Sequence, residues 1–152
     1  MELAQVEEKI RVEWAYMKGV DRSKARVDKT GEVFTPDWLV DEMINEFPQE
    51  IIDNTFVDTS CGDGQLLAGV ILKKMALGAT FEEALSTVVG CDIMESNVEL
   101  CRRRLSCNRP EYYDIVKRNI IIANALNPSE EWPGQTDIDR RRAKELFGYS
   151  FF

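Results

Sequence analysis

The chain has 152 residues, which suits a single hydrophobic core, and its 19 Lys and Arg against 27 Asp and Glu give a net charge of −8. This charge excludes a generally basic surface, so contact with nucleic acid would need a local basic patch or a partner protein. The sequence contains no histidine, which excludes Ser–His and Cys–His nucleophile pairs and an imidazole base. Any catalysis would depend on carboxylates, amides, backbone groups or a cofactor.

The four cysteines form no CxxC pair and no zinc spacing, so we predict no metal site. Cys61 and Cys91 lie in apolar segments and are expected to be small core residues. No signal peptide is recognisable, and no apolar stretch is long enough to cross a membrane. We therefore expect a cytoplasmic protein with free thiols and no membrane contact.

The N-terminal part of the chain predicts two helices. Apolar residues at steps of three and four predict the first over residues 3–18, and a polar linker follows over 19–29. A second helical pattern begins at Thr35-Pro36, with Thr35 as N-cap and Pro36 in the first helical position. Pro48 is expected to end this helix.

Short apolar runs rich in β-branched residues predict three strands in the middle of the chain, over residues 55–58, 87–92 and 119–123. Helical patterns separate these strands. Such alternation is typical of a parallel sheet whose strands are joined by helical crossovers. The expected fold class is therefore α/β, a Rossmann-like parallel sheet with few strands plus N-terminal helices.

Two capping boxes mark helix starts between the strands. Thr80 with Glu83, and Ser96 with Glu99, each predict that a helix begins at the hydroxyl residue. After the third strand, one more helix is expected at about residues 138–147, with a glycine behind it.

The first strand runs into the turn Asp58-Thr-Ser-Cys-Gly62-Asp63-Gly64, and a helix follows. Glycines allow a sharp turn and let a ligand approach the backbone closely. The start of the helix offers free N–H donors and the positive end of the helix dipole to a ligand carboxylate. Such a turn can also be purely structural, so the glycines alone leave both interpretations open.

The second strand ends in Asp92, and Ile93 follows. An acidic residue at this position can accept hydrogen bonds from the ribose hydroxyls of a nucleoside, and an apolar neighbour can cover the adenine. Alternatively, Asp92 only starts the next helix, near Ser96. Because the glycine turn and Asp92 occur in the right order on the right elements, the functional interpretation is favoured.

Three motifs in order carry a resemblance to a known family. They are GEVFTP at 31–36, FVDTSCGDGQLL at 56–67 and GCDIMESNVELCRRRL at 90–105. Together they resemble the S-adenosylmethionine (SAM)-binding half of N6-adenine DNA methyltransferases. More narrowly, they resemble short methyltransferase-like proteins of bacteriophages and the modification subunits of restriction systems.

The resemblance covers residues 29–126, which we expect to form a SAM-binding Rossmann-like domain. It implies a truncated form of the methyltransferase fold. Residues 1–28 are then an N-terminal helix and linker, and residues 127–152 are a C-terminal tail with a short helix.

The residues implied to bind the cofactor lie at helix starts and strand ends. They are Phe34, Thr35, Pro36, Asp58, Cys61, Gly62, Asp63, Gly64, Asp92, Ile93, Asn124, Ala125 and Leu126. By resemblance, the first three line the methionine end of SAM, and Asp58 lies near its amino group in the turn below. Asp92 would bind the ribose and Ile93 would pack on the adenine. The family usually has an acidic residue where this chain has Asn124, which can accept a hydrogen bond but carries no charge.

The target-base motif of the family is missing. Those enzymes place Asn/Asp-Pro-Pro-Tyr/Phe after the fourth strand, where its amide and aromatic ring hold the flipped adenine. Here Asn127-Pro128 is followed by Ser129 and Glu130, and we predict a loop or the start of a helix rather than a displaced catalytic motif. No fourth strand or later hairpin is recognisable, so the catalytic residues are left unassigned.

Three functions are compatible with these motifs. The first is a SAM-dependent adenine methyltransferase acting on DNA. The second is a catalytically inactive SAM-binding or partner-binding protein that completes, inhibits or regulates another complex. The third is an enzyme that consumes SAM without a DNA acceptor. Family resemblance favours the methyltransferase.

Basic residues cluster at 102–104, 109, 117–118 and 140–142. They could meet phosphate, but in an acidic protein we expect them to serve as solvated helix faces or ion-pair partners. A sheet of three strands also leaves an unpaired edge, which proteins normally cover. We therefore expect a homo-oligomer that buries this edge together with the N-terminal helix, and contact with DNA only through a partner or the oligomer.

Overall fold

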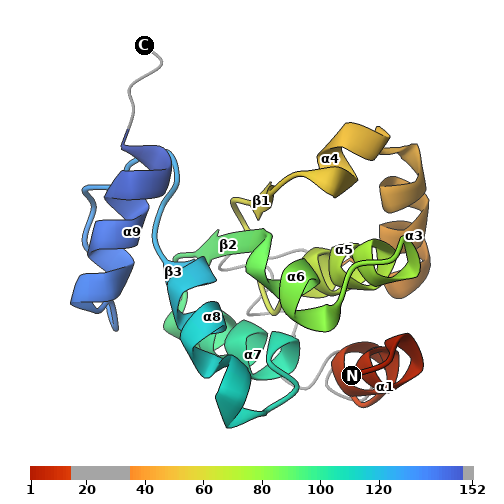
Figure 1. The fold of residues 1–152 in the computed structure, drawn as a ribbon. Coiled ribbons are helices and arrows are strands. Elements are labelled where there is room, and N and C mark those ends of the chain that lie inside the picture. Colours follow the sequence, from red (N-terminus) through yellow and green to blue (C-terminus); the bar gives the residue numbers. More distant parts are fainter. Residues whose placement is uncertain (15–34, 149–152) are drawn as a thin grey trace.

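The computed structural model describes residues 1–14 and 35–148, so that Phe34, one of the predicted cofactor contacts, lies outside the described residues. The fold is α/β, with a parallel sheet of strands β1 (Phe56–Asp58), β2 (Val88–Asp92) and β3 (Ile120–Ile122) in the order β1-β2-β3 (Figure 1). The predicted parallel sheet is thus confirmed. Its small size is compatible with a truncated Rossmann-like fold.

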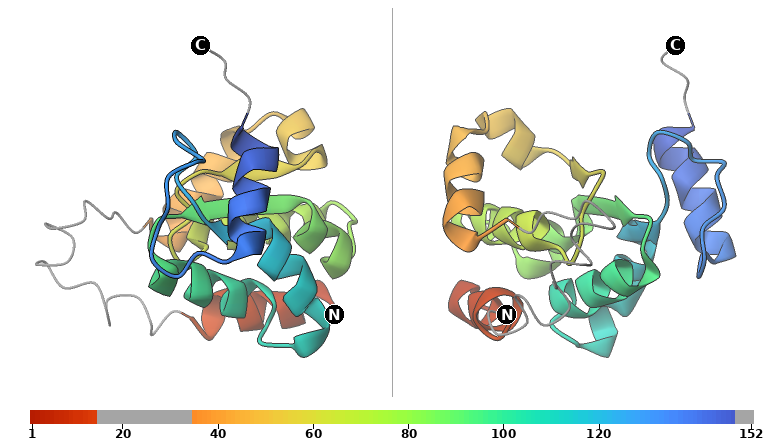
Figure 2. Two further views of the ribbon diagram at one scale, coloured as in Figure 1. Left: turned by 90° about the vertical axis from the view of Figure 1, so that its left-hand side faces the viewer. Right: turned by 180° about the vertical axis from the view of Figure 1, so that it is seen from behind.

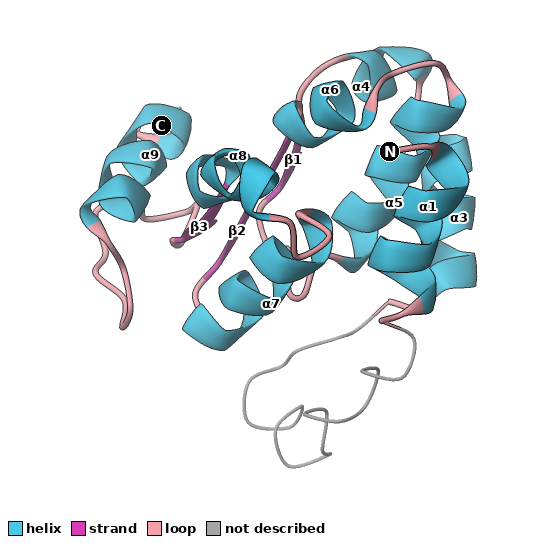
Figure 3. Cartoon of the chain, turned by 60° about the horizontal axis from the view of Figure 1, so that its bottom comes forward, coloured by secondary structure: helices cyan, strands magenta, loops and turns pink. Residues whose placement is uncertain are grey.

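Both crossovers lie on one face of the sheet (Figure 3). The elements of these crossovers are α5 (Gln65–Ala76), α6 (Phe81–Ser86), α7 (Glu95–Leu105), η3 (Pro110–Tyr112) and α8 (Tyr113–Asn119). They bury the side chains of Phe56, Val88, Ile120 and Ile122, which alternate along the strands and point to this face. The main core of the molecule therefore lies between the sheet and these helices.

Within the described residues, the helix on the opposite face is α9 (Asp137–Phe147), which lies at the far side of the sheet from α5 and also contacts α8 (Figure 2). Ala143 of α9 joins Cys91, Ile121 and Ala123 in a second, smaller apolar cluster. This cover extends over β2 and β3 but not over β1, where the side chain of Val57 is 42% exposed. The predicted C-terminal helix is confirmed, starting one residue earlier than expected.

The N-terminal segment is helical and packs against its own chain. It runs as α1 (Leu3–Glu7) and continues as a π-helical turn, η1 (Glu8–Val12), in which Glu13 N donates to Glu8 O. Val6 and Ile10 are fully buried in the main core. The predicted helix is confirmed as far as Val12. It ends earlier than expected, because residues 13 and 14 form a turn, and residues 15–18 of its expected range lie outside the described residues.

Two predicted helix starts are wrong. Helix α3 (Asp37–Glu46) has Pro36 as N-cap, and Thr35 makes no capping bond. Helix α7 begins before Ser96, with Met94 as N-cap, because Met94 N donates to the carboxylate at the end of β2. The other predicted capping box is confirmed, since Thr80 and Glu83 bond to each other's backbone N–H.

Two short helices were not predicted, α8 and α4 (Gln49–Asp53). Both are held by contacts distant in sequence. The Nζ atom of Lys74 donates to Ile52 O at 2.6 Å and Asn54 O at 2.7 Å, which satisfies carbonyls at the end of α4. Asn119, at the end of α8, donates to the carbonyl of Ser86. None of the described helices is long and apolar enough to cross a membrane.

Candidate functional site

The loop between β1 and α5 is a turn fixed by backbone hydrogen bonds. Ser60 N donates to Asp58 Oδ1 at 3.0 Å, which folds the chain back as soon as the strand ends. Cys61 N donates to Cys91 O at 2.9 Å, so the turn is anchored to the neighbouring strand. Gly64 N then donates to Cys61 O at 2.8 Å, immediately before α5 begins. The predicted glycine turn is therefore a rigid connection at the carboxyl end of the sheet.

The two glycines of this turn have left-handed backbones. Gly62 has φ 54° and Gly64 has φ 93°, conformations that glycine adopts without the steric penalty of a side chain. At Gly64 there is no space either, because a Cβ atom would lie 2.8 Å from Cys101 Sγ. At Gly62 no described atom lies within 4 Å of such a Cβ. Glycine at position 64 is thus required by packing as well as by conformation.

Asp92 is joined directly to the glycine turn. Its Oδ2 atom accepts a hydrogen bond from Gly62 N at 3.1 Å, and its Oδ1 atom accepts from Met94 N at 2.9 Å and Asn97 Nδ2 at 3.4 Å. An ionised carboxylate offers about four lone-pair directions, so about one remains, on Oδ2. Asp92 therefore helps to start α7, as the alternative interpretation of this residue predicted. It also retains one acceptor direction, on Oδ2, beside the glycine turn.

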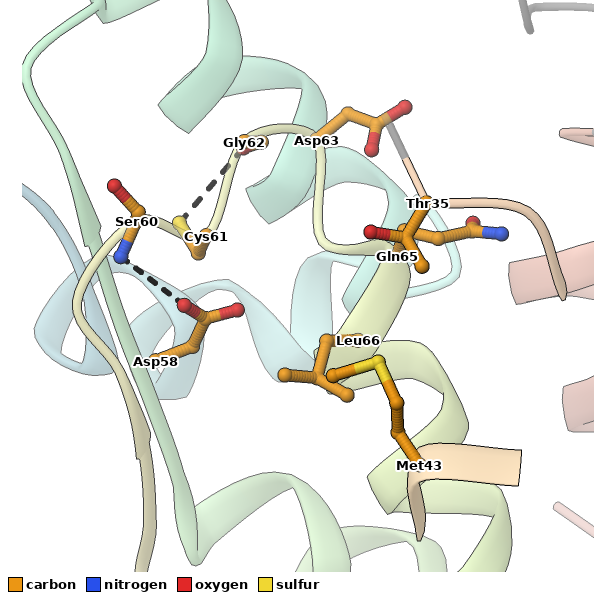
Figure 4. A pocket seen from close by; sticks show the side chains of 9 residues that line it. All are labelled: Thr35, Met43, Asp58, Ser60, Cys61, Gly62, Asp63, Gln65 and Leu66. Carbon is orange, nitrogen blue, oxygen red and sulfur yellow. Dashed lines mark hydrogen bonds between the residues drawn. The ribbon is translucent and has the colours of Figure 1, made fainter. Parts of the chain in front are cut away.

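A hollow opens between the turn, the start of α5 and the start of α3, and Figure 4 shows the side chains around it. Its volume is about 190 Å³. The lining residues are Thr35, Met43, Asp58, Ser60, Cys61, Gly62, Asp63, Gln65 and Leu66. The structure thus brings together Thr35 and four predicted residues of the glycine turn, Asp58, Cys61, Gly62 and Asp63, although they are more than twenty positions apart in sequence. The predicted Pro36 and Gly64 are not among the lining residues.

The site is acidic, and its thiols are buried. Burial raises the pKa of the Asp58 carboxyl, the Ser60 N–H lowers it, and the charge of Asp92 raises it. Burial and the same two carboxylates raise the pKa of the Cys91 thiol to about 12. A hydrogen bond with Cys101, together with burial, raises the pKa of the Cys61 thiol well above its ordinary range. Both thiols are therefore neutral core groups at neutral pH, which agrees with the prediction that they are core residues.

The remaining predicted residues do not line the hollow. Asn124 uses its Oδ1 atom on Leu126 N at 3.0 Å, so its side chain closes a local turn after β3. Leu126 is 95% exposed and Ile93 is 42% exposed, while Ala125 is partly buried beside the small apolar cluster. Ile93 and Leu126 are thus surface residues, and Asn124 and Ala125 are partly buried.

Sequence reasoning missed several residues at the site. Met43, Gln65 and Leu66 line the hollow because α3 and α5 pack side by side (Figure 4). Arg104 is 1% exposed and forms an ion pair with Asp63, with Arg104 Nη1 3.6 Å from Asp63 Oδ1. No sequence signal indicated this burial, because arginine is rarely buried and Arg104 is the last of three consecutive arginines.

The basic clusters are largely occupied within the chain. Ion pairs join Arg102 to Asp139, Arg140 to Asp137, and Arg142 to Glu145. The expectation that these arginines serve as ion-pair partners is confirmed for these three.

Among the described residues, no group of three or more cysteines and acidic residues is arranged to hold a metal ion. We compared the chain with protein-family models, with curated proteins and with solved structures, and none of them matches it.

Proposed function

We propose that the protein is a SAM-binding, methyltransferase-like protein, whose sequence motifs resemble those of N6-adenine DNA methyltransferases. The observation that supports this proposal is the convergence of three sequence motifs at one edge of the sheet. Thr35 and the glycine turn line one hollow, and Gly62 donates a hydrogen bond to Asp92. Cofactor-binding crevices of parallel α/β sheets lie at this edge, beyond the carboxyl ends of the strands.

The chemistry of the hollow fits the methionine end of SAM, which carries an ammonium, a carboxylate and a sulfonium cation. Asp58 and Asp63 supply negative charge for the two cations. The start of α5 has no side-chain cap, so its first N–H groups are available to the carboxylate. Met43 and Leu66 supply apolar surface for the carbon chain.

The adenosine end of SAM would lie outside the hollow. Pockets that enclose a whole small ligand usually measure about 300–1,000 Å³, and this one is about 190 Å³. The remaining lone-pair direction of Asp92 and the exposed side chain of Ile93 are beside it and would take the ribose and the adenine. Binding would therefore be strongest at the methionine end and more open at the base.

Calorimetric titration with SAM tests the proposal. The wild-type chain is expected to bind, and Asp92→Ala to lose about tenfold or more in affinity, since a hydrogen bond to a charged group is removed. Asp92 also holds the turn, so a second variant is needed. Ile93→Ala leaves every hydrogen bond of the turn in place and is expected to lose about fivefold, from lost apolar contact.

Asp114→Ala, which removes an exposed carboxylate from α8, serves as the control and is expected to bind like the wild type. Absence of heat with the wild-type chain would contradict the proposal. Equal affinities for the wild type and both site variants would contradict the assignment of the adenosine end.

One observation favours the binding-protein alternative over DNA methylation. In the described part of the chain after β3, residues 123–136 run through turns into α9, and no fourth strand follows. Asn127, the first letter of the incomplete target-base motif, donates its side-chain amide to Glu130 at 3.2 Å. Transfer of a labelled methyl group from SAM to DNA separates the two functions. Incorporation would establish the enzyme, and SAM binding without incorporation would favour the binding protein.

We also propose a homo-oligomer formed through β1, in a reducing cytoplasm. The side of β1 away from β2 pairs with no other strand of the described chain. The side chain of Val57, on the face of β1 that α9 does not cover, is exposed. Contact with DNA would depend on such an assembly or on a partner, since the net charge is −8. A monodisperse monomer in light scattering at micromolar concentration would contradict the oligomer.

A further inference from the structure

Arg104 lies behind the candidate site and is held from three directions. Its Nε atom donates to Ile10 O at 2.5 Å, and its Nη2 atom donates to Gln65 Oε1 at 2.7 Å. Its Nη1 atom is 3.6 Å from Asp63 Oδ1. A guanidinium offers its donors in a fixed planar fork, so these contacts fix the position of its charge.

These contacts join the site to the N-terminal helix. Ile10 belongs to η1, and its carbonyl is near the end of that helix, where carbonyls lack intrahelical partners. The ring of Trp14 lies over the guanidinium, with its centroid 5.9 Å from Arg104 Cζ. Gln65, which accepts from Arg104, also donates to Asp37 at the start of α3. The arginine is thus anchored in the core, and side-chain motion cannot carry its charge away from the hollow.

Two of the residues that Arg104 contacts, Asp63 and Gln65, form part of the wall of the hollow. A ligand that fills the hollow lies against Asp63, whose carboxylate pairs with Arg104, and Arg104 itself is not among the lining residues. Both side chains are almost fully buried, with exposed fractions of 10% for Asp63 and 1% for Arg104. Charges in such surroundings are screened by water far less than charges at the surface.

We propose that Arg104 is a positioning residue that sets how strongly this site prefers a cationic sulfonium ligand to its uncharged thioether counterpart. This inference rests on the proposed function. SAM and S-adenosylhomocysteine share the same skeleton and differ by one methyl group and the positive charge on sulfur. Arg104 offsets part of the negative charge of Asp63, which weakens the attraction of the hollow for the extra charge of SAM. The ratio of the two affinities therefore reports on this ion pair.

The test is calorimetric measurement of both ligands with four single variants. Arg104→Met removes the cation and is expected to raise the SAM preference by about tenfold, the effect of one nearby charge at intermediate dielectric. Asp63→Asn removes the carboxylate and is expected to lower the preference by a similar factor. Arg104→Lys keeps the charge and is expected to keep the ratio, although it loses the planar fork. Arg103→Met removes an equal charge from the exposed neighbour on α7 and is expected to leave the ratio unchanged.

A purely structural role for Arg104 predicts a different pattern. The Met and Lys variants would then lose affinity for both ligands by the same factor, with no change in ratio, and that result would overturn the inference. If Arg104→Met does not fold, Asp63→Asn decides, since an unchanged ratio there also overturns it. A wild-type chain that binds neither ligand would instead overturn the proposed function, and the inference with it.

Discussion

The turn after β1 and the turn after β3, both at the carboxyl ends of the strands, are built differently, although the sequence has a motif at each. At the β1 end, the backbone of the glycine turn is bonded to Cys91 and Asp92 on β2, and the turn borders a hollow. At the β3 end, Asn124 bonds to its own loop, and Leu126 is exposed. A motif therefore forms a site here only where another element holds its polar groups and an acceptor is still available, as at Asp92.

The charges follow the same division. Asp58, Asp63 and Asp92 gather at the β1 end, with Arg104 behind them. At the β3 end, Asn124 brings no charge. A ligand with a cationic end and an apolar, aromatic end would therefore be held chiefly by its cationic end. If this division holds, substitutions in the turn after β1 destabilise the fold, and substitutions in the turn after β3 have little effect.

The largest effect is expected at Gly64. Gly64→Ala places a Cβ atom 2.8 Å from Cys101 Sγ on a backbone with φ 93°, so strain and overpacking add, and we expect a loss of about 3 kcal/mol in the free energy of unfolding. Gly62→Ala is the matched control. The backbone of Gly62 has φ 54° and space for a Cβ atom, so Gly62→Ala is expected to lose only the conformational part of the free energy of unfolding, about 1 kcal/mol. Denaturant unfolding of both variants measures the difference, and equal losses would break the picture of a turn packed against α7.

An intermediate effect is expected at Asp58, and it depends on pH. Burial raises the pKa of this carboxyl in the folded state, so the folded protein binds the proton more tightly than the unfolded chain. The protonated Asp58 carboxyl therefore adds to the free energy of unfolding at acid pH. This contribution is lost as pH rises from the pKa of the unfolded chain through the higher pKa of the folded protein. Asp58→Asn cannot ionise, and its Oδ1 atom can still accept from Ser60 N.

We therefore expect Asp58→Asn to be more stable than the wild type at pH 7. The gain in the free energy of unfolding is expected to be smaller than the loss caused by Gly62→Ala, and to disappear near pH 3. Denaturant unfolding at the two pH values gives the comparison. The same variant is expected to bind SAM more weakly, because negative charge leaves the hollow. At each pH, the quantity compared is the free energy of unfolding of the variant minus that of the wild type. If this difference is lower at pH 7 than at pH 3, the ionised carboxylate stabilises the turn, which would contradict the prediction.

Much of the fold could be predicted because its signals are local. β-Branched runs gave the three strands to within one or two residues, and the Thr80–Glu83 capping box gave the start of α6. The predicted Ser96–Glu99 box failed because the Asp92 carboxylate, at the end of β2, binds Met94 N and starts α7 earlier. The Ser96–Glu99 pattern itself gives no sign of this acceptor, whereas the alternative interpretation of Asp92, as the start of the next helix, did anticipate it.

The missed parts depend on contacts across the chain. Arginine is rarely buried, so a run of three arginines gives no reason to expect that the last one is in the core. Arg104 is buried because Ile10, 94 residues away, offers an unpaired carbonyl and Gln65 an amide oxygen. The hollow needed the same kind of information, since Met43 and Leu66 meet only when α3 packs on α5.

The smallest effect is expected at Asn124, where sequence resemblance and geometry give opposite expectations. By resemblance, this residue holds the adenine amino group, and its loss would weaken SAM binding about tenfold. In the structure, its Oδ1 atom accepts from Leu126 N in an exposed turn. We therefore expect Asn124→Ala to change the free energy of unfolding by less than about 0.5 kcal/mol and the SAM affinity by less than about twofold. Calorimetry beside Ile93→Ala provides the scale, since the resemblance assigns both positions to the adenosine end. A loss at Asn124 as large as that at Ile93 would mean that the turn after β3 opens to take the base, and the two ends of the sheet edge would then form one site.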